Sequence, residues 1–98
     1  MRVVLNGYKV NLLIYMGYKY SPKQPRIEAV CQGGEPYASV TVCIPEVELG
    51  EYETILDTNN LPDSLDVLVK SNCVVDTGKT VDSGYCEYPI VKVVASIN

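Results

Sequence analysis

Alternation of apolar and polar residues constrains the fold of this chain more than any other feature. Every second residue from Tyr8 to Met16 is apolar, a period that is typical of a β-strand with one buried face. Residues 1–5 are also mainly apolar. The pair Asn6-Gly7 between the two runs is a strong hairpin signal, because both turn positions require positive φ. The sequence therefore predicts an antiparallel hairpin over residues 1–16.

Further strands follow from the same pattern. They are expected at residues 26–31, 37–44, 51–56, 73–75 and 85–95. Pro89 within the last of them suits an edge strand or a bulge, because proline cannot donate a ladder hydrogen bond. Residues 17–25 and 76–84 are expected to be loops, since they contain the proline and glycine residues that punctuate regular structure.

One helix is expected at about residues 61–71. Its apolar stripe consists of Leu61, Leu65, Leu68 and Val69, at helical spacing. Pro62 fits the first turn, and Asn72 can end the helix in the left-handed region. The chain of 98 residues is thus expected to form a single domain, residues 1–98, of the α+β class. We expect a mainly antiparallel β-sheet of five to seven strands with this one helix.

Charge is polarised along the chain. Residues 1–27 carry five bases and no acid, whereas residues 28–69 carry nine acids and no base. The N-terminus lacks the pattern of a secretory signal, and the longest apolar run, Leu12 to Met16, is too short to span a bilayer. We therefore expect a cytoplasmic protein that makes no membrane contact.

Cofactor and metal sites are not expected. The chain has no histidine, the commonest metal ligand and usual general base. Its four cysteines, Cys31, Cys43, Cys73 and Cys86, are too widely spaced for zinc knuckles. In a reducing compartment they are expected to be free thiols. The segment Asp57-Thr58-Asn59-Asn60 resembles the opening of a calcium loop but lacks the inner glycine and the distal glutamate.

The triplet Asp76-Thr77-Gly78 matches the way an aspartic protease presents its catalytic carboxylate. That chemistry requires two carboxylates that share one proton. The second triplet, Asp82-Ser83-Gly84, follows within the same expected loop and so cannot supply the other half of a symmetric site. A turn with Asx hydrogen bonding is the better interpretation. We expect no catalytic residues and no enzyme.

Two surfaces are candidates for binding. The base-free acidic stretch predicts a face that docks on a basic protein, with Glu46, Glu48, Glu51 and Glu53 as contact residues. Aromatic and basic residues interleaved on a sheet are typical of single-stranded nucleic-acid binding. The alternative is therefore a nucleic-acid site, and it consists of Tyr15, Tyr18, Lys19, Tyr20 and Lys23.

Four blocks of sequence resemble a known group of proteins. They span Gly34 to Val42, Asp57 to Asn60, Thr77 to Thr80 and Ser83 to Pro89. In this order they resemble an uncharacterised family of small proteins, about 100 residues long, carried by phages, plasmids and integrative elements of Firmicutes and other gut bacteria. The resemblance covers about residues 8–93 and implies an accessory protein of a mobile element in the cytoplasm of a bacterial host.

The expected function combines these observations. We expect a small non-enzymatic interaction protein of a mobile element that binds a host or element-encoded protein. An inhibitor of a host defence system, of the anti-CRISPR or anti-restriction type, fits this context. Homodimerisation through an edge strand stays open.

Overall fold

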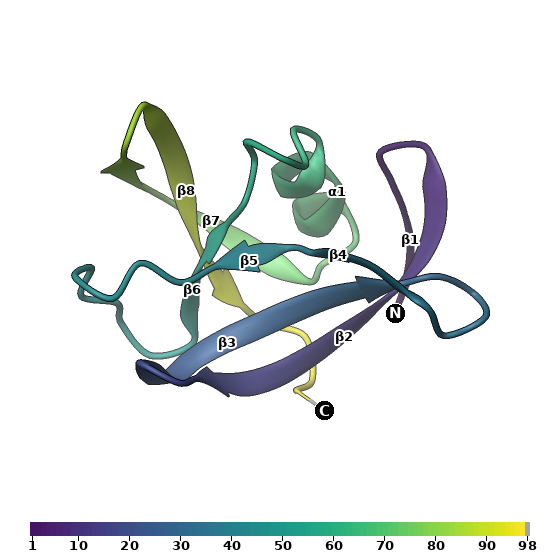
Figure 1. Cartoon of the computed structure of the whole chain (residues 1–98), viewed down its shortest axis with the longest axis horizontal. Coiled ribbons are helices and arrows are strands. Elements are labelled where there is room, and N and C mark those ends of the chain that lie inside the picture. The colour runs from purple at the N-terminus through teal and green to yellow at the C-terminus, as the bar shows by residue number, and fades with distance from the viewer. Residues whose placement is uncertain (98) are drawn as a thin grey trace.

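The computed structural model describes residues 1–97 and contains two antiparallel sheets with one short helix (Figure 1). The first sheet consists of β1 (Arg2–Leu5), β2 (Tyr8–Tyr18), β3 (Ser21–Val30) and β4 (Pro36–Ser39), in that order. The second contains β5 (Thr41–Val42), β6 (Glu53–Leu56), β8 (Cys86–Val93) and β7 (Val74–Ser83), in that order. The helix α1 spans Ser64–Lys70. The α+β class is confirmed, with eight strands in place of the expected five to seven.

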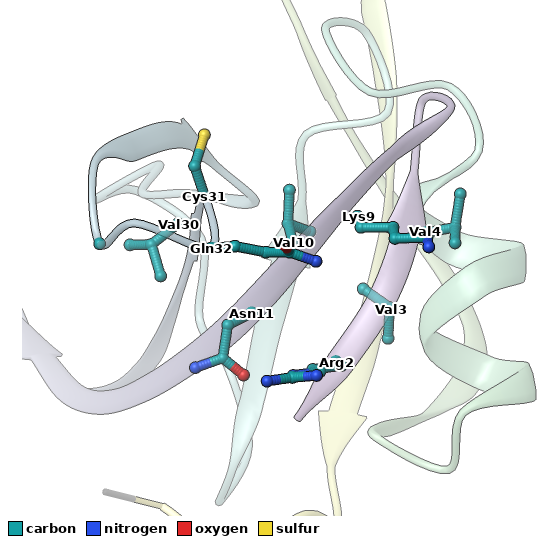
Figure 2. Close-up of a pocket in the computed structure, with 10 residues that line it drawn as sticks. Arg2, Val3, Val4, Lys9, Val10, Asn11, Val30, Cys31 and Gln32 are labelled. Carbon is teal, nitrogen blue, oxygen red and sulfur yellow. The ribbon is translucent and has the colours of Figure 1, made fainter.

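The first hairpin forms where the sequence predicts it. Asn6 and Gly7 have φ values of 53° and 82°, as a two-residue turn of this type requires. Val3 faces Val10 across the ladder, and the inward face of β2 is buried as predicted, except at its ends. The hairpin and the turn after β3 flank a pocket (Figure 2).

Val40 is the point at which the chain passes from one sheet to the other. Its N–H donates to the carbonyl oxygen of Ile27 on β3 (2.9 Å), and its own carbonyl accepts from the N–H of Asp57, which follows β6 (2.9 Å). The single strand expected at residues 37–44 is therefore divided into β4 and β5. Val40 and Thr41 are both buried, so the predicted alternation breaks there.

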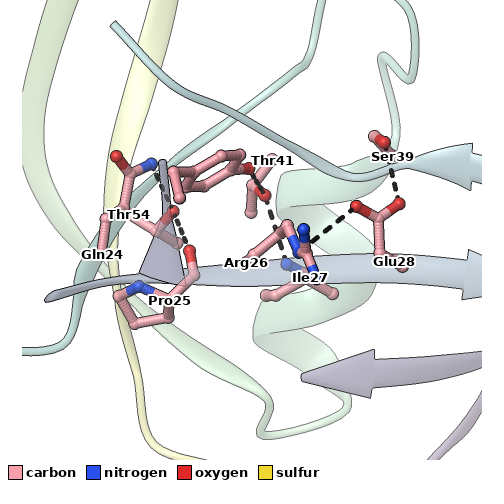
Figure 3. A network of polar contacts seen from close by, with 9 residues as sticks. Gln24, Pro25, Arg26, Ile27, Glu28, Ser39, Thr41 and Thr54 are labelled. Carbon is pink, nitrogen blue, oxygen red and sulfur yellow. Dashed lines mark hydrogen bonds and ion pairs between the residues drawn. The ribbon is translucent and has the colours of Figure 1, made fainter. Parts of the chain in front are cut away.

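Polar side chains connect the two sheets beside this crossing (Figure 3). The buried Gln24 donates through Nε2 to the carbonyl of Val42 (3.0 Å) and to Oγ1 of Thr54 (3.0 Å). Thr54 in turn donates to the carbonyl of Pro25 (2.7 Å). Since buried polar groups cost free energy when they lack a partner, these bonds hold β3 and β6 in one relative position.

The loop expected at residues 17–25 is instead mostly strand. β4 reaches only the Glu28–Val30 end of β3, so Pro22 and Pro25 lie where β3 has one strand neighbour. There the missing N–H of a proline is tolerated. Gly17 supplies the bulge, with φ 102° and a Cβ position only 3.0 Å from the carbonyl oxygen of Pro22.

The prediction of a loop at residues 76–84 is also wrong, because most of this segment is strand. β7 extends as far as Ser83, and its irregularity is a bulge between Asp76 and Thr80. The chain reverses at Gly84, whose φ of 62° fits the first central position of a type II′ hairpin turn. Pro89 pairs with Thr80 beside the bulge and lies beyond the part of β8 that pairs with β6, so the bulge and the free edge both apply at this position.

The helix is shorter than predicted, because it begins at Ser64 after the N-cap Asp63, so Leu61 and Pro62 precede it. Leu61 and Leu68 are buried, and Val69 at 38% exposure is not. Asn72 has a φ of 59°, the left-handed ending that the sequence indicates. The helix packs against β1 and β7. One hydrophobic cluster joins side chains of both sheets and the helix, among them Leu5, Ile27, Leu56, Leu68 and Val91.

Candidate interaction surface

The β7–β8 hairpin projects beyond the sheet to which it belongs. β6 pairs with β8 only from Ile90 to Lys92, whereas β7 pairs with β8 as far as Ser83 and Cys86. The outer part of the hairpin, residues 80–89, is therefore a two-stranded ribbon without a third strand, and Figure 1 shows it rising at the upper left. A ribbon of this kind has unpaired backbone edges that can bind another chain.

The base of the ribbon is fixed by hydrogen bonds. Oδ1 of Asp76 accepts from the N–H of Gly78 (2.9 Å), and Oγ1 of Thr77 donates to the carbonyl of Ile90 (2.6 Å). Lys79 Nζ lies 2.8 Å from Oε2 of Glu53 on β6. The triplet Asp76-Thr77-Gly78 thus makes the Asx turn that the sequence favours, and it anchors the ribbon.

The tip of the ribbon combines an aromatic ring with acids. Tyr85 is fully exposed at the turn. Asp82 and Glu87 face each other across the ladder and are both exposed. Like charges directly opposite each other in a sheet are destabilising. The tip therefore carries negative charge that a cationic partner would relieve.

A second acidic segment is the β5–β6 connection, residues 43–52. Glu46, Glu48 and Glu51 are exposed on it. Local hydrogen bonds hold the segment, among them those from Val47 N–H to the carbonyl of Ile44 (3.0 Å) and from Gly50 N–H to Oε1 of Glu53 (2.7 Å). In Figure 1 this connection and the ribbon tip lie toward the same end of the longest axis. We call residues 43–52 and 82–87 together the acidic end.

Charge divides between the two sheets. Residues 1–39, which form the first sheet, hold five bases and two acids. Residues 40–97 hold three bases and ten acids. The polarity read along the chain is therefore also a polarity in space, because each half of the sequence forms its own sheet. A field of this kind orients a charged partner as it approaches.

Glu53 differs from the other three predicted contact residues. It is 9% exposed, and its carboxylate receives the bonds from Lys79 and Gly50 described above. The hydrogen bond from Lys79 lowers the pKa of Glu53 from its ordinary value of 4.5, and the Gly50 N–H lowers it further. This carboxylate ties the ribbon to the acidic connection and does not face solvent, so only Glu46, Glu48 and Glu51 can meet a partner.

The Glu53→Gln variant is expected to lose about 1–2 kcal/mol of stability at neutral pH, because the hydrogen bond from Lys79 then has a neutral acceptor in place of a charged one. The loss stays modest because solvent screens the partly exposed Lys79. A lowered folded-state pKa contributes stability that is present above pH 4.5 and is lost as the pH falls through that lower pKa. The difference between wild type and variant should therefore vanish in acid. Urea unfolding at a series of pH values measures it, and a difference independent of pH would contradict this role.

The alternative nucleic-acid residues differ in the contacts that their side chains make. The Tyr18 hydroxyl is hydrogen-bonded to Oγ1 of Thr41, and burial raises the pKa of Tyr18. Tyr15 lies under the guanidinium of Arg26, 5.2 Å from ring centroid to Cζ. At the tip of the β2–β3 hairpin, Nζ of Lys19 lies 5.3 Å from the ring centroid of the exposed Tyr20.

Lys23 belongs to the same hairpin but faces the acidic end. It lines a concave region together with Met16, Gly50, Glu51 and Tyr52. One residue of each candidate site, Lys23 and Glu51, therefore lines the same concave region. The positive charge of Lys23 offsets part of the negative charge of Glu51, so Lys23 lies at the boundary of the acidic end.

Residues 1–97 contain no cluster of side chains that is suited to a metal ion. No three histidine, cysteine or acidic side chains in that range could hold a metal ion together. Cys73 is buried, and burial raises the pKa of its thiol. Within the same residues, α1 is too short and too polar to cross a membrane.

The residues at the ribbon tip are not among those predicted from the sequence. Asp82 falls in the segment expected to be a loop, and Tyr85 and Glu87 fall in the strand expected to follow it. The signal for the correct turn is Gly84 between two short β-prone runs, because a glycine at the first turn position favours type II′.

Comparison with known proteins gives one family match. A family model described as a domain of unknown function (DUF4313) matches residues 14–96. No curated protein and no solved structure matches the chain. The match begins within β2 and continues past the end of β8, so it includes both the ribbon and the acidic connection.

Proposed function

The chain belongs to the DUF4313 family of domains of unknown function, and we propose that it is a non-enzymatic interaction protein whose acidic end docks on a basic protein surface. The observation that carries this proposal is the projecting β7–β8 ribbon, with a fully exposed Tyr85 between Asp82 and Glu87. The acids of the β5–β6 connection lie toward the same end of the molecule (Figure 1).

The physical argument rests on two complementary contributions. Tyrosine is enriched among the few interface residues that supply most of the binding energy, and a hairpin tip can insert its ring into a pocket. Opposed acids such as Asp82 and Glu87 weaken the free ribbon and gain an attractive partner on binding. Charge complementarity also speeds association and selects the correct partner.

The partner proposed is a nucleic-acid-binding protein of bacterial defence, such as a CRISPR nuclease or a restriction enzyme. Proteins of this class hold nucleic acid in grooves rich in Lys and Arg, and carboxylates on a ribbon can occupy such a groove in place of phosphates. The resemblance to accessory proteins of phages and plasmids supports this partner, as well as a location in the bacterial cytoplasm.

The test is capture of the partner from bacterial lysate with tagged chain, before and after nuclease treatment. The proposal expects a basic protein in stoichiometric amount that survives nuclease, is released by salt, and is displaced by competing DNA. Capture that disappears with nuclease, or a partner that DNA does not displace, would contradict it.

Single-stranded nucleic-acid binding is the second candidate. It is favoured by one observation, the exposed Tyr20 with Lys19 beside its ring at the β2–β3 tip. An electrophoretic mobility shift with a single-stranded oligonucleotide discriminates between the two functions. Binding that weakens steeply with salt and disappears in Tyr20→Ala would establish this alternative in place of protein docking.

A further inference from the structure

A pocket of about 560 Å³ lies at the first sheet, apart from the acidic end. The β1–β2 hairpin and the turn after β3 form it (Figure 2). Four of its lining residues are valines, and none is acidic. Its volume falls within the range of roughly 300–1,000 Å³ typical of small-molecule sites.

Two cations face this pocket. Arg2 pairs with Asn11 across the β1–β2 ladder, and Val4 pairs with Lys9, so these side chains share one face of the sheet, as Figure 2 shows. Neither Arg2 nor Lys9 takes part in an ion pair among residues 1–97. Two cations in one concavity without an anion raise the local positive potential and attract a dianion.

The other lining groups complement the cations. The side-chain amides of Asn11 and Gln32 line the pocket and can donate hydrogen bonds to a ligand. Gly34 borders it with open space where a side chain would stand. Val4 and Val30 provide an apolar wall on which a flat ring can pack, because they lie on the same face of the sheet as the two cations. The other two valines lie on the opposite face, against the core. The pocket thus offers two positive charges, amide donors and an apolar wall.

We propose that this pocket binds a nucleoside monophosphate. The phosphate monoester, which carries a charge of about −1.5 to −2 near neutral pH, lies between Arg2 and Lys9, and the guanidinium of Arg2 engages two of its oxygens. The base packs on the valine wall. The same monoester can come from a free nucleotide or from the 5′ end of a nucleic-acid strand.

Isothermal titration of the full chain with AMP tests the proposal, with adenosine and inorganic phosphate as separate probes. AMP should bind at least roughly tenfold more tightly than either fragment, because it uses both parts of the pocket. A 5′-phosphorylated dinucleotide distinguishes the sources: binding as tight as AMP assigns the strand end, and weaker binding assigns the free nucleotide. No heat with AMP or with the dinucleotide at millimolar concentration would overturn the proposal.

A matched pair of variants locates the site. Val4 and Val75 are each 53% exposed on an edge strand, and each faces a lysine across the ladder, Lys9 and Lys92 respectively. Val4→Glu places a carboxylate in the pocket and should abolish AMP binding. Val75→Glu makes the same change elsewhere and should leave it intact. Equal AMP affinity in the two variants would overturn the assignment.

A second pair keeps the test independent of folding. Arg2→Ala removes only an exposed side chain and should weaken AMP binding roughly tenfold, the cost of a charged hydrogen bond. Lys70→Ala removes an exposed cation on the helix, paired only with Asp66 among residues 1–97, and should leave binding unchanged. Unchanged affinity in Arg2→Ala would exclude a phosphate site between Arg2 and Lys9.

Discussion

Replacing Leu56 by alanine is expected to lower the free energy of unfolding by about 3 kcal/mol. Leu56 is fully buried on β6 and belongs to the cluster that joins both sheets and the helix. Truncation of a buried leucine costs roughly 2–5 kcal/mol, because the lost contacts leave a cavity that closes only partly. Since a domain of this kind is stable by about 5–15 kcal/mol, one substitution removes a large fraction.

Urea denaturation followed by circular dichroism measures this effect. Val75→Ala is the control, since the side chain of Val75 is half exposed and its truncation should change stability by about 0.5 kcal/mol or less. A Leu56→Ala variant as stable as Val75→Ala would contradict the packing of the two sheets around one core.

Replacing Tyr85 by alanine is expected to weaken binding of the protein partner by about 30-fold or more without change in stability. The ring of Tyr85 is fully exposed in the free chain, so its removal costs no packing. Truncation of an interface tyrosine that fills a pocket typically costs about 2 kcal/mol or more, and each 1.4 kcal/mol is about tenfold in affinity.

Surface plasmon resonance with the captured partner measures the affinity. Tyr20→Ala is the matched control, because Tyr20 is also an exposed tyrosine near a hairpin tip but lies outside the acidic end. A comparable loss in both variants, or no loss in Tyr85→Ala, would exclude the ribbon tip as the anchor.

Local signals in the sequence are sufficient to predict the elements whose conformation depends on neighbouring residues alone. Asn6-Gly7 predicts the first hairpin because its φ angles leave few alternatives. The helical spacing of Leu65 and Leu68 predicts α1, and the structure confirms a helix there, but its start at Ser64 lies later than the predicted start at Leu61.

The sequence predictions are wrong for elements whose structure depends on residues far away in the sequence. Pro22 and Pro25 indicate a loop, yet β3 accommodates them because β4 is too short to reach that part of the strand. The sequence predicts Glu53 as a contact residue, but in the fold Lys79 and Gly50 donate hydrogen bonds to its carboxylate in a buried position. Such compensation depends on tertiary contacts and cannot be derived from alternation alone.

Some candidate site residues can likewise be predicted from local sequence, whereas others depend on tertiary contacts. The acidic stretch is visible in composition, so Glu46, Glu48 and Glu51 could be proposed. Their grouping with Asp82 and Glu87 depends on β8 lying between β6 and β7, a sheet order that no local pattern specifies. The sequence pattern predicts Tyr18 as a nucleic-acid contact, but in the fold its hydroxyl is hydrogen-bonded to Thr41.

Charge reversal at the acidic end tests the central claim most directly. The measurement is nuclease-treated capture from bacterial lysate with wild type and with the triple variant Glu48→Lys, Asp82→Lys and Glu87→Lys. Asp66→Lys, a reversal at an exposed acid on the helix, is the control. We expect wild type and the control to retain the same basic protein, and the triple variant, still folded by circular dichroism, to lose it. Capture of that protein by the triple variant in wild-type amount would contradict the account.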